Sequence, residues 1–322
     1  MESVCIGAAQ FESRDADKAA NLEAVDRLAG QARARGAQVV AFHELCVTAY
    51  TFFKDLSRPQ VEALAETIPE GPSTQNLIQI ARRHRLAVLA GLVERDADGL
   101  LYNTYVCVDE QGLRARHRKL HPFISKYFSA GGDFTVFELC GWTCGILTCY
   151  DNNVIENVRA TALLGARIIF APHVTGCTPS PMPGRGFVDP HLWEHRLGDP
   201  APLRQEFDGP KGRGWLMRWL PARAYDNGVY YVFSNPIGMD GDQLKPGLSM
   251  LLDPYGEILA ECRSFGEEVA LALFTPDKLE KAGGFRYLRA RRPELYREIL
   301  GQPHEGITAP VWRSPDSSPP QK

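Results

Sequence analysis

Apolar residues along this chain recur with two different spacings, and the two spacings alternate through its first half. Short apolar runs typical of buried strands occupy residues 4–11 and 38–44. Between them, apolar positions at helical spacing predict a helix over residues 16–35, and Gly36 is suited to end it. Because a strand–helix–strand unit normally places its two strands parallel and adjacent, the chain is predicted to open as part of an α/β sheet.

Beyond residue 84 the apolar runs are short and are separated by turn residues. Acidic residues and glycines at 96–99 and 109–112 predict an antiparallel meander. The predicted strands cover residues 86–93, 101–108, 113–118, 135–139, 144–149, 167–171, 229–234, 249–253, 258–262 and 268–274, and the further predicted helices cover residues 72–84, 154–164 and 215–227. The simplest packing of these elements is two sheets face to face with helices outside, a four-layer αββα sandwich of the α/β class.

The same pattern divides the chain into one domain and a tail. We expect a single domain over residues 1–301, interrupted at residues 177–214 by a Pro- and Gly-rich excursion with little strand or helix pattern. Long loops of this kind often form pocket walls, so the excursion is expected near the pocket. Residues 302–322 are rich in Pro and Ser, and we predict a tail that is mobile or draped over a partner.

Composition narrows the class of protein. With 322 residues, 44% hydrophobic content and a net charge of -3, the chain can bury a large core and has no basic stripe for nucleic acid or an anionic membrane. A small-molecule substrate is therefore the expected partner. No apolar run reaches ~18 residues and the start lacks a signal-peptide layout, so we expect a cytoplasmic location. The eight cysteines are then expected to be reduced thiols, without a disulfide framework or a metal site.

Three polar residues stand at the ends of apolar runs and indicate covalent chemistry. They are Glu44, Lys119 and Cys149. Cys149 comes just before a predicted helix, whose free N–H groups favour a thiolate and a developing oxyanion. A carboxylate beside the thiol can take its proton, and a lysine can stabilise the anions that form. Position alone leaves a second interpretation open, in which Cys149 is a buried structural thiol and Glu44 a capped strand end.

The residues around these three occur in a recognisable order. A glutamate is followed by Arg-Lys-Leu-His, by Gly-Ile-Leu-Thr-Cys-Tyr-Asp and by Gly-Ala-Arg-Ile-Ile-Phe-Ala-Pro. This order resembles the nitrilase superfamily of carbon–nitrogen hydrolases, from about Val4 to Leu300. The resemblance implies an αββα subunit that pairs through its helices into a homodimer or a larger homo-oligomer. It also implies Glu44 as general base, Lys119 as stabiliser and Cys149 as nucleophile.

The implied reaction is cysteine-dependent hydrolysis of a non-peptide C–N bond in a small amide or N-carbamoyl compound. Attack by Cys149 would give a thioester and release ammonia or an amine, and water would then release the acid. The backbone N–H of Tyr150 would join Lys119 in the oxyanion hole, and no metal or organic cofactor is required. Aromatic residues near such a pocket also serve simple packing. The residues expected to bind substrate are Tyr50, Phe53, Lys126, Phe128, His173 and Trp193.

One stretch departs from the pattern of the superfamily. Many members carry a second glutamate in the loop after the lysine, whereas residues 121–132 contain no acid, and Lys126 stands near its place. The departure leaves open a substrate with a negative group, a substitute acid from elsewhere, or reduced activity.

Three other functions stay open. Members of the superfamily that act on nitriles commonly carry tryptophan after the cysteine, so Tyr150 favours an amide, and a nitrilase is the first alternative. A catalytically weak scaffold or binding protein of the same fold is the second. The third is a zinc hydrolase, because His191-Leu-Trp-Glu-His195 matches an inverted zinc-peptidase motif with His191 and His195 four residues apart.

Overall fold

A six-stranded sheet built from both ends of the chain forms one half of the molecule. In this computed structural model, which describes residues 1–180 and 182–302, the order of the first sheet is β14-β1-β2-β3-β4-β5. Its strands are β1 (Val4–Gln10), β2 (Val39–Ala41), β3 (Ala87–Arg95), β4 (Leu101–Asp109), β5 (Gly112–Arg118) and β14 (Glu268–Phe274). The parallel strands β1, β2 and β3 lie in the middle, and β14 on one side and β4 and β5 on the other are antiparallel. The predicted meander is confirmed.

The second sheet repeats this arrangement with the order β13-β12-β9-β8-β7-β6. Its strands are β6 (Thr135–Leu139), β7 (Trp142–Ile146), β8 (Ile168–Pro172), β9 (Tyr230–Ser234), β12 (Met250–Leu252) and β13 (Ile258–Glu261). Here β7, β8 and β9 are the parallel strands in the middle. Each sheet therefore has a parallel centre, where the ends of neighbouring strands lie at one edge.

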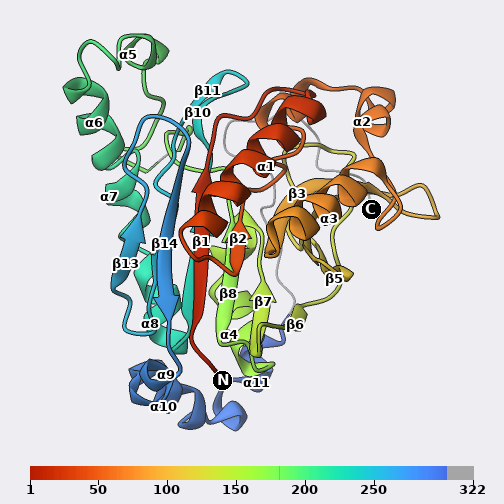
Figure 1. The fold of residues 1–322 in the computed structure, drawn as a ribbon. Helices are drawn as coiled ribbons and strands as arrows, with labels where there is room; N and C mark the ends of the chain where they lie inside the picture. The colour runs from red at the N-terminus through yellow and green to blue at the C-terminus, as the bar shows by residue number, and fades with distance from the viewer. Residues whose placement is uncertain (181, 303–322) are drawn as a thin grey trace.

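Helices cover the outer face of each sheet. The helices α1 (Lys18–Ala34) and α3 (Pro72–His84) cover the first sheet, and α4 (Ile155–Leu163) and α8 (Leu220–Asn227) cover the second (Figure 1). Apolar residues of both sheets meet between them, among them Leu89 of β3 and Phe170 of β8. The αββα sandwich predicted from the pattern is confirmed.

The other elements lie around this sandwich. The short helices α9 (Asp277–Lys281), α10 (Gly283–Arg289) and α11 (Arg297–Leu300) gather at the end of the molecule where the N-terminus lies, and α5 (Pro190–Glu194) and α6 (Ala201–Asp208) lie at the other end (Figure 1). The remaining elements are α2 (Arg58–Leu64), α7 (Arg213–Leu216), the hairpin strands β10 (Ile237–Asp240) and β11 (Gln243–Pro246), and the 3-10 helices η1 (Thr51–Asp55), η2 (Cys149–Asn152) and η3 (Pro293–Leu295). The sequence pattern did not predict the hairpin or the helices after residue 276.

The excursion at 177–214 is more regular than predicted. It contains α5, α6 and the start of α7, and it buries Leu203 and Phe207. Proline suggested irregular chain here, yet Pro190 is the first residue of α5 and Pro200 caps α6. Proline suits the first turn of a helix because the N–H it lacks would have no partner there.

Two predicted elements have different boundaries in the structure. The strand before Cys149 ends at Ile146, and η2 stands between it and α4. The helix predicted at 215–227 is two helices, because Pro221 opens the first turn of α8. Within the described residues, no helix is both long and apolar enough to cross a membrane. The predicted tail at 302–322 lies, apart from Gln302, outside the described residues, and the single domain over 1–301 stays a prediction.

Candidate active site

Segments that follow three different strands bring Glu44, Lys119 and Cys149 together. Glu44 lies just beyond β2, Lys119 directly follows β5, and Cys149 lies beyond β7 and begins η2. The first two strands belong to one sheet and β7 to the other, so the group spans the boundary between the sheets. The exposed fractions of the three residues are 0%, 1% and 5%. Their charges therefore act on one another with little screening by water.

The carboxylate of Glu44 has one occupied oxygen and one open oxygen. Oε1 accepts hydrogen bonds from Lys119 Nζ at 2.5 Å and from Asn103 Nδ2 at 2.6 Å. Oε2 is buried and accepts no hydrogen bond from any residue that the structure describes. Burial raises the pKa of Glu44, and the opposing effect of Lys119 and Asn103 does not cancel it. The group is thus a stronger base than an ordinary glutamate and has an oxygen ready for a proton.

A glycine in β3 makes room for the backbone that carries this glutamate. A Cβ on Gly91 would lie 2.2 Å from the backbone nitrogen of Leu45 and 3.0 Å from the carbonyl carbon of Glu44. No side chain fits at that distance, so the strand can approach the Glu44 segment only with glycine at this position.

Lys119 keeps its positive charge although it is buried. Burial by itself lowers the pKa of the ammonium group, but the negative charge of Glu44, followed by contributions from Cys149 and Asp151, outweighs that effect and raises the pKa above its usual value. A protonated lysine at this place can stabilise both a thiolate and a developing oxyanion.

The thiol of Cys149 is not ionised by its surroundings. Burial, followed by the charge of Glu44, raises the pKa of Cys149 to about 12, although Lys119 and a hydrogen bond from the backbone of Val174 act in the opposite direction. The residue also has a φ of +50°, a left-handed conformation that costs a non-glycine residue free energy and is concentrated at functional sites. Attack by this sulfur therefore requires a base that removes the proton, and Glu44 is in place for it.

Asp151, which is not among the predicted site residues, connects the lysine segment to the turn at Cys149. Its carboxylate accepts hydrogen bonds from the backbone N–H groups of Leu120 at 3.2 Å, His121 at 2.8 Å and Thr148 at 3.1 Å. Burial would raise the pKa of Asp151, but His117 and these donors outweigh it and lower the pKa. The available signal was the spacing Thr148-x-x-Asp151, which forms a capping box at η2.

Three of the predicted pocket residues share one apolar cluster beside Lys119. Tyr50, Phe53 and Phe128 are buried there together with Val174. The ammonium of Lys119 lies 5.5 Å from the ring centre of Tyr50, and the ring centres of Phe53 and Phe128 are 5.4 Å apart. Of these three rings, Tyr50 approaches the ammonium, and the two phenylalanines pack against each other in the same cluster.

Phe123 approaches the same ammonium, and the ring of Tyr150 packs against Phe123. The ring centre of Phe123, which the sequence analysis did not select, is 4.9 Å from Lys119 Nζ and 5.4 Å from the ring centre of Tyr150. Tyr150 is 38% exposed. In the described part of the chain no acceptor takes its backbone N–H, so this donor is open beside Cys149.

His173 is a neutral packing residue in this structure. Its ring is fully buried against Trp219 and Phe233, and its Nε2 lies 3.2 Å from Nδ2 of Asn152 in η2. Burial, followed by the charge of Lys119, holds the pKa of His173 well below its usual range. It supports the turn that carries the thiol.

Lys126 and Trp193 lie apart from this group. Lys126 is exposed, and its ammonium lies 5.3 Å from the ring centre of Tyr127. Trp193 packs under the guanidinium of Arg196 at 3.7 Å and, with Ser13, lines a cavity of about 710 Å³. No hydrogen bond, ion pair or ring contact among the described residues joins either side chain to the three strand-end residues.

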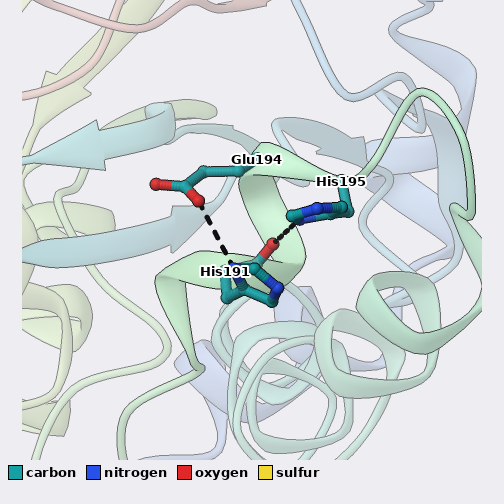
Figure 2. A group of neighbouring side chains, drawn as sticks. All are labelled: His191, Glu194 and His195. Carbon is teal, nitrogen blue, oxygen red and sulfur yellow. Dashed lines mark hydrogen bonds and ion pairs between the residues drawn. The ribbon is translucent and has the colours of Figure 1, made fainter.

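The histidines of the zinc-peptidase motif also lie elsewhere. His191, Glu194 and His195 form an exposed group on α5 and the residue after it, with possible ligand atoms within 4.8 Å of one another (Figure 2). Nδ1 of His191 lies 3.4 Å from Oε2 of Glu194, and Nδ1 of His195 lies 2.9 Å from the carbonyl oxygen of His191. These residues could hold a metal ion, but all three are exposed, and no described hydrogen bond or ion pair joins them to Glu44, Lys119 or Cys149.

Comparisons with known proteins agree with the observed fold. The profile described as carbon-nitrogen hydrolase matches residues 5–283. A nitrilase of Pyrococcus abyssi is 31% identical over 78% of this chain and 82% of its own, and an (R)-stereoselective amidase of a Pseudomonas species is 29% identical over 91% and 93%. The solved structure of a mutant amidase of the nitrilase superfamily from Nesterenkonia superposes with a TM-score of 0.68 at 24% identity, over 92% of this chain and 97% of that one.

The resemblance seen in the motifs is thus confirmed over most of the chain. A profile that covers nearly all the residues between β1 and α10, together with relatives aligned over most of their lengths, leaves no other fold family to consider. This chain belongs to the carbon–nitrogen hydrolase family.

Proposed function

We propose that this protein hydrolyses small amides or N-carbamoyl compounds, with Cys149 as nucleophile, Glu44 as general base and Lys119 with the Tyr150 N–H as the oxyanion hole. The observation that carries the proposal is the buried Glu44–Lys119 pair beside a protonated thiol, with Oε2 of Glu44 open. A thiol with a raised pKa and a base with an unoccupied oxygen are complementary partners for proton transfer.

The first half of the reaction forms a thioester. The Cys149 thiol loses its proton to Oε2 of Glu44 while the sulfur attacks the carbonyl carbon. The oxygen of the tetrahedral intermediate becomes an anion that Lys119 Nζ and the Tyr150 N–H stabilise. When the C–N bond breaks, the proton on Glu44 passes to the nitrogen, and ammonia or an amine leaves.

The second half regenerates the enzyme. A water molecule gives a proton to Glu44 and attacks the thioester carbon, and the same oxyanion donors stabilise the second tetrahedral intermediate. Breakdown of that intermediate returns the proton to the sulfur and releases the carboxylic acid. The same carboxylate thus serves both steps, which is why its open oxygen matters.

Ammonia release from a substrate panel tests the reaction class. We expect turnover of primary amides or N-carbamoyl compounds and at least about 10-fold slower turnover of nitriles with the same side chain. Faster hydrolysis of the nitriles would favour the nitrilase alternative, and a nitrilase is among the relatives. No turnover of any compound would favour a scaffold. Bound stoichiometric zinc and loss of activity on chelation would favour the zinc hydrolase at His191 and His195.

The pH profile tests Glu44 as the base. Because burial raises the pKa of Glu44, we expect kcat/KM for a neutral amide to fall on the acid side, above the pH at which an ordinary glutamate titrates. Asn103→Leu removes a hydrogen bond that favours the charged carboxylate, so the pKa rises further and the acid limb moves to higher pH. In this variant we expect the value of kcat/KM on the plateau at higher pH to change less than the position of the acid limb. An unmoved limb in this variant would remove Glu44 as the titrating base.

We also propose that two copies of the chain pair through α4 and α8. The outer faces of these helices expose large apolar side chains: Ile155 is 57% exposed, Leu163 45%, Leu164 57% and Tyr225 43%. Ile155 and Leu163 also line a shallow cavity of about 590 Å³ between α4, α8 and α11. An exposed apolar face of this kind marks an interaction surface, and a second copy of the same face satisfies two-fold symmetry.

Light scattering coupled to size exclusion tests this pairing. We expect a dimer or a larger assembly for the parent protein, and a shift to monomer in Ile155→Asp/Leu163→Arg, with the dissociation constant raised at least about 100-fold because charges replace buried apolar contacts. Leu197→Asp, at an 88% exposed position in the excursion, should leave the assembly unchanged. A monomeric parent at micromolar concentration would contradict the proposal.

A cytoplasmic location stays a prediction from the sequence.

A further inference from the structure

Lys245 is a buried cation without a counter-ion. It lies on β11 opposite Gly238 of β10 and is 1% exposed. Its ammonium donates one described hydrogen bond, to Oε1 of Gln243 at 2.7 Å. No carboxylate of the described residues lies within 4.0 Å of Nζ, whereas the other fully buried lysine, Lys119, has Glu44. An ammonium buried with a single neutral acceptor is costly for folding, and such groups are concentrated at functional sites.

The nearest acid on the hairpin does not neutralise Lys245. The carboxylate of Asp240 accepts hydrogen bonds from the backbone N–H groups of Tyr50 at 3.0 Å and Thr51 at 3.1 Å, and from the hydroxyl of Thr51. These donors hold the carboxylate in place as an anchor for the segment of Tyr50. The hairpin is therefore fixed to one wall of the site, and the ammonium keeps donor capacity that none of the described residues uses.

The two ends of the hairpin are fixed to the segment that contacts Cys149. Asn235 accepts a hydrogen bond from the N–H of Thr175 at 2.8 Å and donates from Nδ2 to the carbonyl oxygens of Thr175 and Gly247. Pro246 lies against Gly176, where an added Cβ would come within 2.7 Å of its ring. Residue 174, whose backbone contacts the thiol, is one position before Thr175. Lys245 is thus carried between the two segments that border the nucleophile.

The segment that holds the hairpin also borders Cys149, and Lys245 interacts electrostatically with that residue. Burial lowers the pKa of Lys245, and Asp240, followed by Cys177 and Cys149, opposes that effect. Among the described residues, no hydrogen bond joins the ammonium of Lys245 to the thiol of Cys149.

We propose that Lys245 binds a carboxylate at the far end of the substrate. The substrate class is then a carboxylic acid that carries a terminal amide or an N-carbamoyl group. This inference rests on the proposed function, because it concerns the same site. The substrate carboxylate would supply the negative charge that the described residues do not place beside the ammonium, and it would accept hydrogen bonds from the ammonium N–H groups. Such charge-assisted hydrogen bonds are stronger than neutral ones. A neutral amide would leave the buried cation unpaired and would bind less well.

Matched substrate pairs test the proposal with the full-length protein. Glutaramate, the monoamide of a five-carbon diacid, is compared with pentanamide, which has the same chain without the carboxylate. We expect kcat/KM for glutaramate to exceed that for pentanamide at least about 30-fold, and Lys245→Met to remove most of this preference while it changes pentanamide turnover by less than about threefold. Lys281→Met, at an exposed position on α9, is the matched control and should keep the preference.

Two outcomes would overturn the inference, and they differ from failure of the reaction itself. An equal loss of kcat/KM for both substrates in Lys245→Met would assign the lysine a structural role. A parent enzyme that prefers pentanamide would exclude a carboxylate subsite. If no amide is hydrolysed, the proposed function fails, and calorimetric titration with glutarate still tests the subsite. Binding to the parent that weakens at least about 10-fold in Lys245→Met would keep the subsite, whereas unchanged binding would reject it. Lys245→Met should melt no lower than the parent, because it removes an unpaired buried charge.

Discussion

Replacement of Cys149 by alanine is expected to lower kcat for amide hydrolysis by at least about 10⁴-fold. No described group near Glu44 offers a second sulfur or hydroxyl nucleophile in hydrogen-bond contact with its carboxylate. Serine at position 149 should be almost as inactive, because a hydroxyl is a weaker nucleophile than a thiol. Ammonia release measures the loss, and circular dichroism checks that the fold is retained.

The covalent intermediate gives this prediction a second measurement. Intact-mass spectrometry of the parent after brief exposure to substrate should show an acyl adduct, and peptide mapping should place it on Cys149. Cys140→Ala is the matched control, because Cys140 is the exposed cysteine among the described residues and the one most open to unspecific modification. It should retain both activity and the adduct. An adduct on a cysteine other than Cys149, or activity that survives Cys149→Ala, would refute the assignment.

Loss of Lys119 is the second large effect that we expect. Lys119→Met leaves the Glu44 carboxylate buried without a cation, which should lower the free energy of unfolding by ~3–5 kcal/mol. The same variant loses an oxyanion donor, so kcat should also fall by about 10³-fold. The destabilisation should shrink as the pH falls, because a protonated Glu44 needs no counter-charge. Urea unfolding at several pH values measures the first effect, and ammonia release measures the second.

A double variant separates stability from catalysis. Glu44→Gln/Lys119→Met replaces both charges by neutral groups of similar size, so most of the stability should return while activity stays lost. Arg27→Met is the matched control at the exposed ion pair with Glu267, and it should change stability by less than ~1 kcal/mol. A double variant that is as unstable as the sum of the single ones would mean that Glu44 and Lys119 do not interact.

The elements of this fold could be predicted where one spacing persisted over several residues. The predicted helix at 72–84 matches α3 at both ends, and strands such as β6 match to the residue. The excursion at 177–214 was harder, because its helices are short and begin with prolines that normally indicate a break. The hairpin that carries Lys245 was missed, because its short strands include a proline and charged residues and lack an apolar alternation.

The residues of the candidate site also divide into those that a sequence pattern identified and those that it did not. Glu44, Lys119 and Cys149 could be selected because each stands at the end of a predicted strand, and because the order of their motifs resembles a known superfamily. Asn103 and Phe123 were missed, because neither stands in a motif and each acts only through a contact across the fold. Trp193 and Lys126 were selected for their residue type, and in the structure they lie apart from the three strand-end residues.

The sequence by itself determined the αββα class and the selection of Glu44, Lys119 and Cys149 as the proposed reactive side chains, since both depend on local spacing and residue type. The tertiary structure decided the burial, the hydrogen bonds and the pKa shifts of those side chains. Burial raises the pKa of the Cys149 thiol, the contact with Lys119 leaves one oxygen of Glu44 open, and the hairpin buries Lys245 with Gln243 as its described hydrogen-bond acceptor. These properties arise from distances between residues far apart in the chain, and no local pattern encodes such distances.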